Sequence, residues 1–106
     1  MSDDLLRFEL ARNDTNETLY VTGELDISTA SALEHAVARA LDGQGGEFRL
    51  DVGGMTFMDS TGAHALLRVH RQITALGRRL VIRSPTPPVR LVLEILGLDQ
   101  VIDVRQ

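Results

Sequence analysis

The 106-residue chain lacks cysteine, long hydrophobic runs and an excess of basic residues, and each absence removes a class of protein. Without cysteine, neither a disulfide framework nor a thiolate metal site is possible. The apolar runs are too short to cross a bilayer. The N-terminal residues Met1–Asp4 lack the basic start and apolar core of a signal peptide. We therefore expect one soluble, cytoplasmic domain over residues 1–106, without membrane insertion.

Charge and motif content narrow the chemistry further. The 15 acidic residues outnumber the 11 basic ones and give a formal charge of -4, which disfavours direct binding of nucleic acid. Gly43–Gly46 lacks the Lys-Ser/Thr that would complete a phosphate-binding loop. His64 and His70 diverge by about 240° on a helix, and no carboxylate pair completes a metal site. We expect no metal, no cofactor and no self-phosphorylation.

The N-terminal part of the chain has the pattern of a β-hairpin followed by a helix. Apolar residues alternate with polar ones over Leu6–Leu10 and again around Leu19–Val21, with turn-forming residues between. The alternation breaks at Gly23–Asp26. Helical spacing then begins, with Ser28, Thr29 or Ser31 as candidate N-caps. Ser31–Glu34 matches a capping box, and Gly43–Gly46 is expected to end this helix.

The rest of the chain repeats a strand followed by a helix. The predicted elements are a strand over Phe48–Val52 ended by Gly53-Gly54, a helix around Ala63–Ile73, a buried strand at Leu80–Ile82, a helix opened by Pro87-Pro88, and a short strand within Val101–Val104. The order β-β-α-β-α-β-α-β predicts an α/β fold. We expect a mixed β-sheet, largely parallel after the hairpin, with the helices packed mainly on one face.

The segment Met55–Gly62 looks least like scaffold. It connects a strand to an amphipathic helix, and Asp59, Ser60 and Thr61 are all competent N-cap residues. Asp26 has the same two interpretations, as a turn or cap residue or as a functional carboxylate. From local pattern alone, a structural cap and a functional site are equally good interpretations.

Two motifs taken together resemble the STAS domain family and, within it, the anti-sigma factor antagonists. The motifs are Gly23–Asp26, followed by Thr29-Ala30 and Leu33, and Phe57–Gly62. Leu96–Leu98 and the predicted strand order are also similar to that family. The similarity runs from about Leu5 to Val104, so the resemblance implies a single STAS domain.

The resemblance also implies a regulatory function rather than an enzyme. In such antagonists the serine directly after the aspartate is phosphorylated, which is Ser60 in this chain. An anti-sigma factor serine kinase would use ATP to modify Ser60, and a phosphatase would reverse it. The unphosphorylated form would bind the anti-sigma factor and release its sigma factor. The expected partner-binding residues are Asp26, Asp59, Ser60, Thr61, Gly62 and His64.

Physical chemistry indicates how such a modification would act. At the start of a helix, a phosphate on Ser60 would meet unsatisfied backbone N–H groups and the positive end of the macrodipole. It would add a charge of about -1.5 to -2 near pH 7. We therefore expect phosphorylation to change the binding surface and leave the domain folded, as a monomer or weak dimer.

One departure from the family pattern bears on this hypothesis. Where the family commonly has Leu-Gly after the glycine of the second motif, this chain has Ala63-His64. A bulkier residue there would alter which kinase fits, or would accompany a loss of phosphorylation. Two alternatives follow: a non-switching STAS subunit of a larger assembly such as a lipid transporter, and a small hydrolase or phosphotransferase that uses Ser60 or His64. No Gly-x-Ser-x-Gly elbow supports the last one.

Overall fold

The computed structural model describes residues 6–13, 16–41 and 46–106. Its elements are β1 (Leu6–Asn13), β2 (Asn16–Leu25), α1 (Ala30–Ala40), β3 (Glu47–Met58), α2 (Ser60–Ala75), β4 (Arg79–Arg83), α3 (Pro87–Ile95), the 3-10 turn η1 (Leu98–Gln100) and β5 (Asp103–Arg105). The predicted order of strands and helices is confirmed. Among the described residues, no helix has the length and apolar character needed to cross a membrane.

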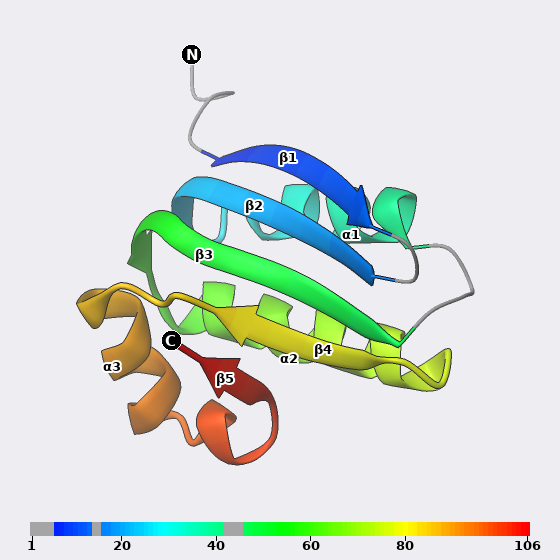
Figure 1. The fold of residues 1–106 in the computed structure, drawn as a ribbon. Coiled ribbons are helices and arrows are strands. Elements are labelled where there is room, and N and C mark those ends of the chain that lie inside the picture. Colours follow the sequence, from blue (N-terminus) through cyan, green and yellow to red (C-terminus); the bar gives the residue numbers. More distant parts are fainter. Residues whose placement is uncertain (1–5, 14–15, 42–45) are drawn as a thin grey trace.

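The five strands form one mixed sheet in the order β1-β2-β3-β4-β5. β1 and β2 pair antiparallel, and every later neighbour pairs parallel. Figure 1 shows α1 and α2 side by side on one face of this sheet, with α3 beside β5 at its lower edge. The predicted architecture is therefore confirmed. Because β2 and β3 are parallel neighbours, their C-terminal ends lie together, at the left in Figure 1.

Two predicted strand ends are wrong. β2 continues past Gly23 to Leu25, and β3 passes through Gly53-Gly54 to Met58. The pairing shifts register in this region instead of ending there. A Cβ at Gly54 would lie 2.4 Å from Cγ2 of Thr22, so the glycine permits a close approach of the two strands.

The helix boundaries follow capping and proline chemistry. The predicted capping box at Ser31–Glu34 is wrong, because α1 begins at Ala30 with Thr29 as its N-cap, which was one of the alternative starts. α2 and α3 lie where the apolar spacing predicts them, and α3 has proline in its first turn. Gly97 ends α3 with a φ of 72°. The predicted stop at Gly43–Gly46 lies largely outside the described residues.

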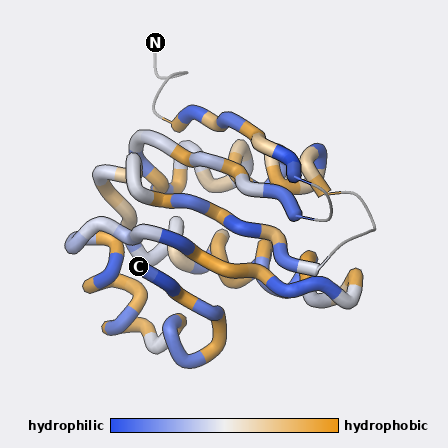
Figure 2. The backbone as a smooth tube through the Cα atoms, viewed as in Figure 1, coloured by the Kyte–Doolittle hydropathy of each residue, from blue (hydrophilic) through white to orange (hydrophobic). Residues whose placement is uncertain are grey.

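The two faces of the sheet differ in chemistry. Hydrophilic and hydrophobic residues alternate along the strands in Figure 2, as the period of two requires. On the face away from α1 and α2, Glu47 contacts Arg49 at 3.0 Å and Arg105 at 3.2 Å. Burial opposes ionisation of Glu47, but these two arginines together lower the pKa of its carboxyl. On this face, the acidic and basic side chains therefore pair with one another.

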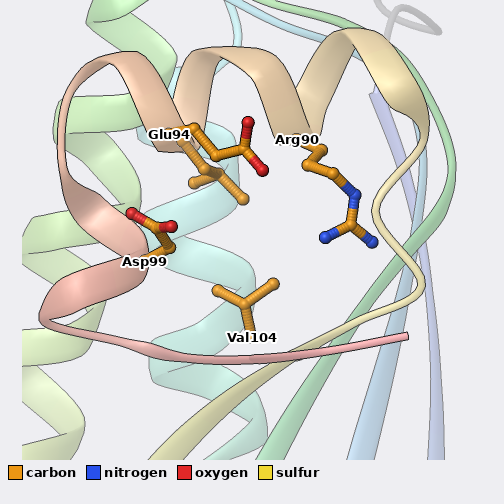
Figure 3. Close-up of a pocket in the computed structure, with 5 residues that line it drawn as sticks. Arg90, Glu94, Asp99 and Val104 are labelled. Carbon is orange, nitrogen blue, oxygen red and sulfur yellow. The ribbon is translucent and has the colours of Figure 1, made fainter.

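A hollow of about 190 Å³ lies between α3 and β5. Figure 3 shows Arg90 and Glu94 of α3 beside it, with Asp99 of η1 and Val104 of β5 completing the rim. It lies beside β5, an edge strand of only three residues.

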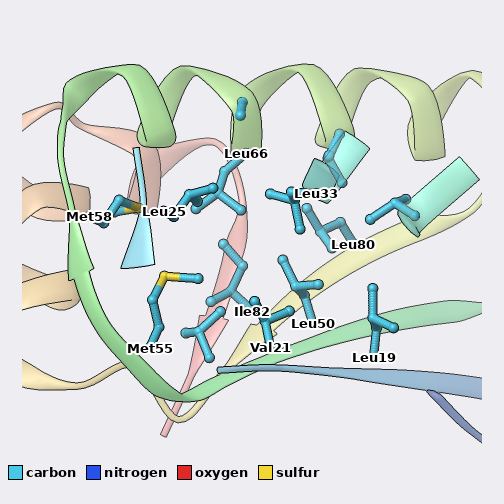
Figure 4. Packing of buried hydrophobic residues seen from close by; sticks show 14 of the residues in the cluster. Leu19, Val21, Leu25, Leu33, Leu50, Met55, Met58, Leu66, Leu80 and Ile82 are labelled. Carbon is cyan, nitrogen blue, oxygen red and sulfur yellow. The ribbon is translucent and has the colours of Figure 1, made fainter. Parts of the chain in front are cut away.

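The hydrophobic core lies between the sheet and the helices. Leu50, Leu66 and Ile82 are completely buried in it. Figure 4 shows Leu25 and Met58, the last residues of β2 and β3, lying beneath the first turns of α2. The start of α2 is therefore anchored directly on the core, which gives the segment at its N-terminus a rigid base.

Candidate functional site

The two sequence motifs meet at one end of the sheet. Leu25 of β2 pairs with Met58 of β3, so Asp26 and Asp59 follow two residues that are already in register. The backbone N–H of Asp59 donates to the carbonyl oxygen of Leu25 at 3.3 Å and links the two strand-to-helix loops. The two strand-to-helix loops therefore lie at one shared end of the sheet.

Asp59 is the N-cap of α2. Its Oδ1 accepts a hydrogen bond from the backbone N–H of Gly62 at 2.9 Å, and its carbonyl accepts one from Ala63 at 2.9 Å. This side chain therefore stabilises the helix start, which is the structural role that the sequence left open for it. A carboxylate at this position also complements the positive end of the helix dipole.

Ser60 is the first residue of α2 and is exposed to solvent. Its hydroxyl makes no hydrogen bond to any residue that the structure describes. The N–H groups of the first helical turn have no intrahelical acceptor, and Asp59 takes up the one on Gly62. The hydroxyl is therefore accessible, and donors for a negative group are nearby.

Gly62 has a packing role at the start of α2. It is buried, and a Cβ at this position would lie 2.5 Å from the carbonyl oxygen of Leu25 and 2.8 Å from its Cγ. Only a residue without a side chain lets α2 begin this close to β2. The prediction that Gly62 binds a partner directly stays untested, but its close contact with Leu25 explains the glycine.

Asp26 is held by its own loop. Its Oδ1 accepts hydrogen bonds from the backbone N–H of Ser28 at 2.9 Å and from the Ser28 hydroxyl at 2.7 Å. The Thr29 hydroxyl donates to the Glu24 carbonyl at 2.8 Å and accepts from the Asp26 N–H at 3.0 Å. The Ser28 hydroxyl is the main reason that the pKa of the Asp26 carboxyl is below its ordinary value.

The remaining predicted residues lie along the start of α2. Thr61 is half-buried, whereas His64 is exposed. His64 follows Ser60 by four residues, so the two side chains are neighbours on one face of the helix. Arg68 continues this line one turn later, where it forms an ion pair with Glu34 at 2.9 Å.

The predicted binding residues leave out two exposed hydrophobic residues close to this site. The side chain of Ile27 is 79% exposed, and that of Phe57 is 46% exposed. Ile27 follows Asp26 in the β2–α1 loop, and Phe57 lies near the end of β3, three residues before Ser60. In the sequence, Ile27 could have been noticed as an apolar residue inside an otherwise polar turn. Phe57 could have been noticed as an apolar residue that interrupts the alternation of a strand. Large apolar side chains left in water beside a functional segment are typical of binding surfaces.

Comparison with known proteins places this geometry in a family. A family model described as "Mlab, STAS domain" matches residues 8–104. The anti-sigma-B factor antagonist of Bacillus subtilis is 22% identical over 99 residues, covering 93% of this chain and 90% of that protein. An anti-sigma factor antagonist from Mycobacterium paratuberculosis superposes with a TM-score of 0.80 at 24% identity, covering 97% of this chain and 87% of that one.

The Bacillus protein SpoIIAA is similar in both of its solved forms. The unphosphorylated form has a TM-score of 0.75 and covers 94% of this chain and 89% of its own. The phosphorylated form has a TM-score of 0.68 and covers 94% of this chain and 92% of its own. Both forms are 22% identical to this chain. At these identities the solved structures establish the fold.

The fold and the family match together define the class. The chain belongs to the STAS domain family. Within that family it is similar to the anti-sigma factor antagonists, in agreement with the prediction from its two motifs.

Proposed function

We propose that this protein is an anti-sigma factor antagonist whose binding to an anti-sigma factor serine kinase is controlled by phosphorylation of Ser60. The unphosphorylated form binds the kinase and releases the sigma factor, and the phosphorylated form does not. A phosphatase resets the switch. The similarity to antagonists named for sigma-B and sigma-F systems supports the class of partner.

One observation carries this proposal: the Ser60 hydroxyl is exposed and unoccupied, whereas the polar groups around it are engaged. Asp59 is bound to the Gly62 N–H, and Asp26 is bound to Ser28. Of the hydroxyls within the second motif, that of Ser60 is on the exposed residue and that of Thr61 on a half-buried one. Ser60 is therefore the group that a kinase reaches first.

The surroundings explain why a phosphate would weaken binding. Ile27 and Phe57 supply the apolar contacts of the proposed interface. A partner that packs on them removes water from the neighbouring Ser60. Desolvating a phosphate dianion without a counter-ion is unfavourable by several kcal/mol, and Asp26 and Asp59 add like charge. Each ~1.4 kcal/mol lowers affinity tenfold.

Phosphorylation with the cognate kinase tests the proposal. The purified protein is incubated with the anti-sigma factor and ATP, and intact mass is measured together with release of the sigma factor. We expect one phosphate per chain, lost in Ser60→Ala and retained in the matched variant Thr61→Ala. Phosphate that persists in Ser60→Ala, or a kinase complex that survives full phosphorylation, would refute the switch.

The family model that matches this chain favours a second candidate function. Its description, "Mlab, STAS domain", does not mention an anti-sigma factor antagonist. In this alternative the domain is a non-switching STAS subunit of a larger assembly such as a lipid transporter. Ser60 then docks on the partner and is never modified. The Ala63-His64 departure is consistent with it. Co-purification from the native host distinguishes the two, since a serine kinase as the main partner supports the switch and a transporter subunit supports the alternative.

A further inference from the structure

His64 lies one helical turn after Ser60 on the same face of α2, and both residues are exposed. Four residues correspond to about 40° of rotation and about 6 Å along the helix axis. Because side chains in a helix lean towards its N-terminus, the imidazole of His64 leans over the turn that begins with Ser60. It makes no hydrogen bond or ion pair with any residue that the structure describes. The ring nitrogens of His64 are therefore available to a group attached to the Ser60 hydroxyl.

The next cation along this face of α2 is already paired. Arg68 follows His64 by four residues, and its Nη2 contacts Oε2 of Glu34 on α1 at 2.9 Å. Its Nε donates to the same carboxylate oxygen at 3.0 Å. This pair shows that the face carrying Ser60, His64 and Arg68 is turned towards α1. Arg68 is therefore engaged with α1, and His64 is the nearer of the two to Ser60.

The charged groups close to this turn are otherwise acidic. Asp59 caps α2, and Asp26 lies in the β2–α1 loop that is linked to it, so both place negative charge at this end of the sheet. On α1, Glu34 is the charged residue turned towards α2, and His35 lies about 100° further round the helix. A phosphate on Ser60 would therefore be placed among carboxylates.

The charged groups of the other elements packed against α2 face elsewhere. Asp51 of β3 and Arg83 of β4 are opposite each other in the sheet. They alternate with the core residues of their strands and therefore lie on the face away from α2. Arg90 and Glu94 of α3 line the hollow beside β5 (Figure 3). Among the described residues, His64 is therefore the basic side chain that the fold leaves unpaired beside the start of α2.

We propose that His64 is the counter-ion of the phosphate on Ser60 and makes the phospho-switch sensitive to pH. The inference rests on the proposed modification of Ser60. An anion followed by a cation four residues later is the favourable orientation for an ion pair on a helix. A protonated imidazole donates a charge-assisted hydrogen bond to a phosphate oxygen, and histidine gains and loses its proton near neutral pH. Protonation of His64 thus controls how much of the phosphate charge is balanced within the protein.

These charges give the pH effect a definite direction. At mildly acidic pH the imidazolium balances part of the phosphate charge, so phosphorylation lowers the affinity for the anti-sigma factor less. At pH 8 the imidazole is neutral and the phosphate is a dianion, so phosphorylation lowers the affinity most. The phosphate itself also gains a proton near its second pKa of about 6, which acts in the same direction. A variant without the imidazole therefore isolates the contribution of His64.

Phosphorus NMR on the full chain tests the pair directly. Phosphoserine is incorporated at position 60 during translation, and the second pKa of the phosphate is measured in the wild type and in His64→Gln. We expect this pKa to be lower in the wild type by at least about 0.3 pH units, because the imidazolium stabilises the dianion. His64→Arg, which keeps a cation, should preserve the low value. Equal values in the wild type and His64→Gln would overturn the proposal.

His70→Gln is the matched control for this measurement. His70 belongs to the same helix but follows Ser60 by ten residues, about 15 Å along the axis, so its loss should leave the phosphate pKa unchanged. An equal rise of that pKa in His70→Gln and His64→Gln would show that general charge on α2 is responsible and would refute the pair. Circular dichroism confirms that each variant is folded.

Binding to the anti-sigma factor tests the consequence for the switch. The ratio of the affinities of the unphosphorylated and phosphorylated proteins is measured at about pH 6.5 and about pH 8 for the wild type and His64→Gln. At the lower pH we expect this ratio to be about twofold larger in His64→Gln, and at the higher pH the two proteins should agree. Ratios that agree at both pH values would refute the control of the switch by His64.

The two proposals can fail separately, because phosphoserine is incorporated at position 60 without the kinase. A phosphate pKa that depends on His64, with no phosphorylation of Ser60 by the kinase, would retain the counter-ion and refute the switch. Phosphorylation by the kinase, with equal phosphate pKa values in the wild type and His64→Gln, would retain the switch and refute the role of His64.

Discussion

The β2–α1 loop and the β3–α2 loop begin side by side, yet they use their polar groups differently. In the first, Ser28 donates its hydroxyl to Asp26 at 2.7 Å, and Thr29 bonds to Glu24 and Asp26. In the second, Asp59 caps the helix and the Ser60 hydroxyl stays without a hydrogen-bond partner among the described residues. The polar side chains of the first loop bond to one another and to its backbone. The second loop leaves the Ser60 hydroxyl exposed to solvent.

This difference shows how a support can be told from a switch when both contain the same residue types. Ser28 and Ser60 are both exposed serines close to an aspartate and a helix start. The hydrogen bond to Asp26 makes the Ser28 hydroxyl part of the scaffold. The unbound hydroxyl of Ser60 can be modified without loss of a native hydrogen bond. We therefore expect its modification to change the free energy of partner binding more than the free energy of unfolding.

The largest expected effect compares negative charge at the two serines. Ser60→Asp should weaken binding to the anti-sigma factor by at least about tenfold, because it introduces an unpaired carboxylate into the proposed interface. Ser28→Asp should weaken it less, because the switch is proposed to act at Ser60, whereas the Ser28 hydroxyl is already bonded to Asp26 within its own loop. Isothermal titration calorimetry measures both affinities. Equal losses would mean that net charge, rather than the position of Ser60, controls binding.

The next effect concerns the contact that holds the two loops together. Gly62→Ala should lower the free energy of unfolding by about 1–3 kcal/mol, because its Cβ would meet the Leu25 backbone at 2.5 Å. Gly46→Ala is the matched control, since a Cβ there has nothing within 4 Å. Urea denaturation gives both values. A Gly62→Ala protein as stable as Gly46→Ala would show that the loops separate easily.

Some features of this fold could be predicted from local signals in the sequence. The helices α2 and α3 were predictable because apolar spacing, proline and glycine are local signals that agree with one another. The second motif indicated Ser60, and the structure places it at the start of α2 as expected. Periodicity and caps determine where a segment becomes a helix.

Other features depend on partners far away in the chain. β3 continues through Gly53-Gly54 because β2 pairs along it, which no local pattern reveals. Arg78, in a basic cluster near the start of β4, is buried and paired with Glu17, which lies 61 residues earlier. The exposure of Ile27 and Phe57 was likewise missed, because it depends on how the two loops are arranged in space.

A smaller effect isolates the cap of the second loop. Asp59→Ala removes the acceptor for the Gly62 N–H and should destabilise the protein by about 1 kcal/mol. Asp59→Asn should retain most of this stability, because the amide oxygen can accept the same hydrogen bond. Thermal unfolding measured on both variants separates capping from charge. If Asp59→Asn loses as much as Asp59→Ala, the negative charge at the helix start matters more than the hydrogen bond.

The smallest effect concerns the pH dependence of the first loop. The pKa of Asp26 is lower in the folded protein than in the unfolded chain, chiefly through the Ser28 hydroxyl. The folded state therefore binds the proton less readily, so Asp26 adds stability above the unfolded pKa of about 3.9, and this contribution is lost as pH falls through the lower folded value. Denaturation midpoints of the wild type and Asp26→Asn should differ at neutral pH and converge below about pH 4. Ser28→Ala should reduce the same difference, because it removes the strongest of the bonds that hold the carboxylate. A constant gap between the wild type and Asp26→Asn across the acid range would mean that the Asp26 charge contributes nothing, and that the first loop is held by backbone and hydroxyl bonds alone.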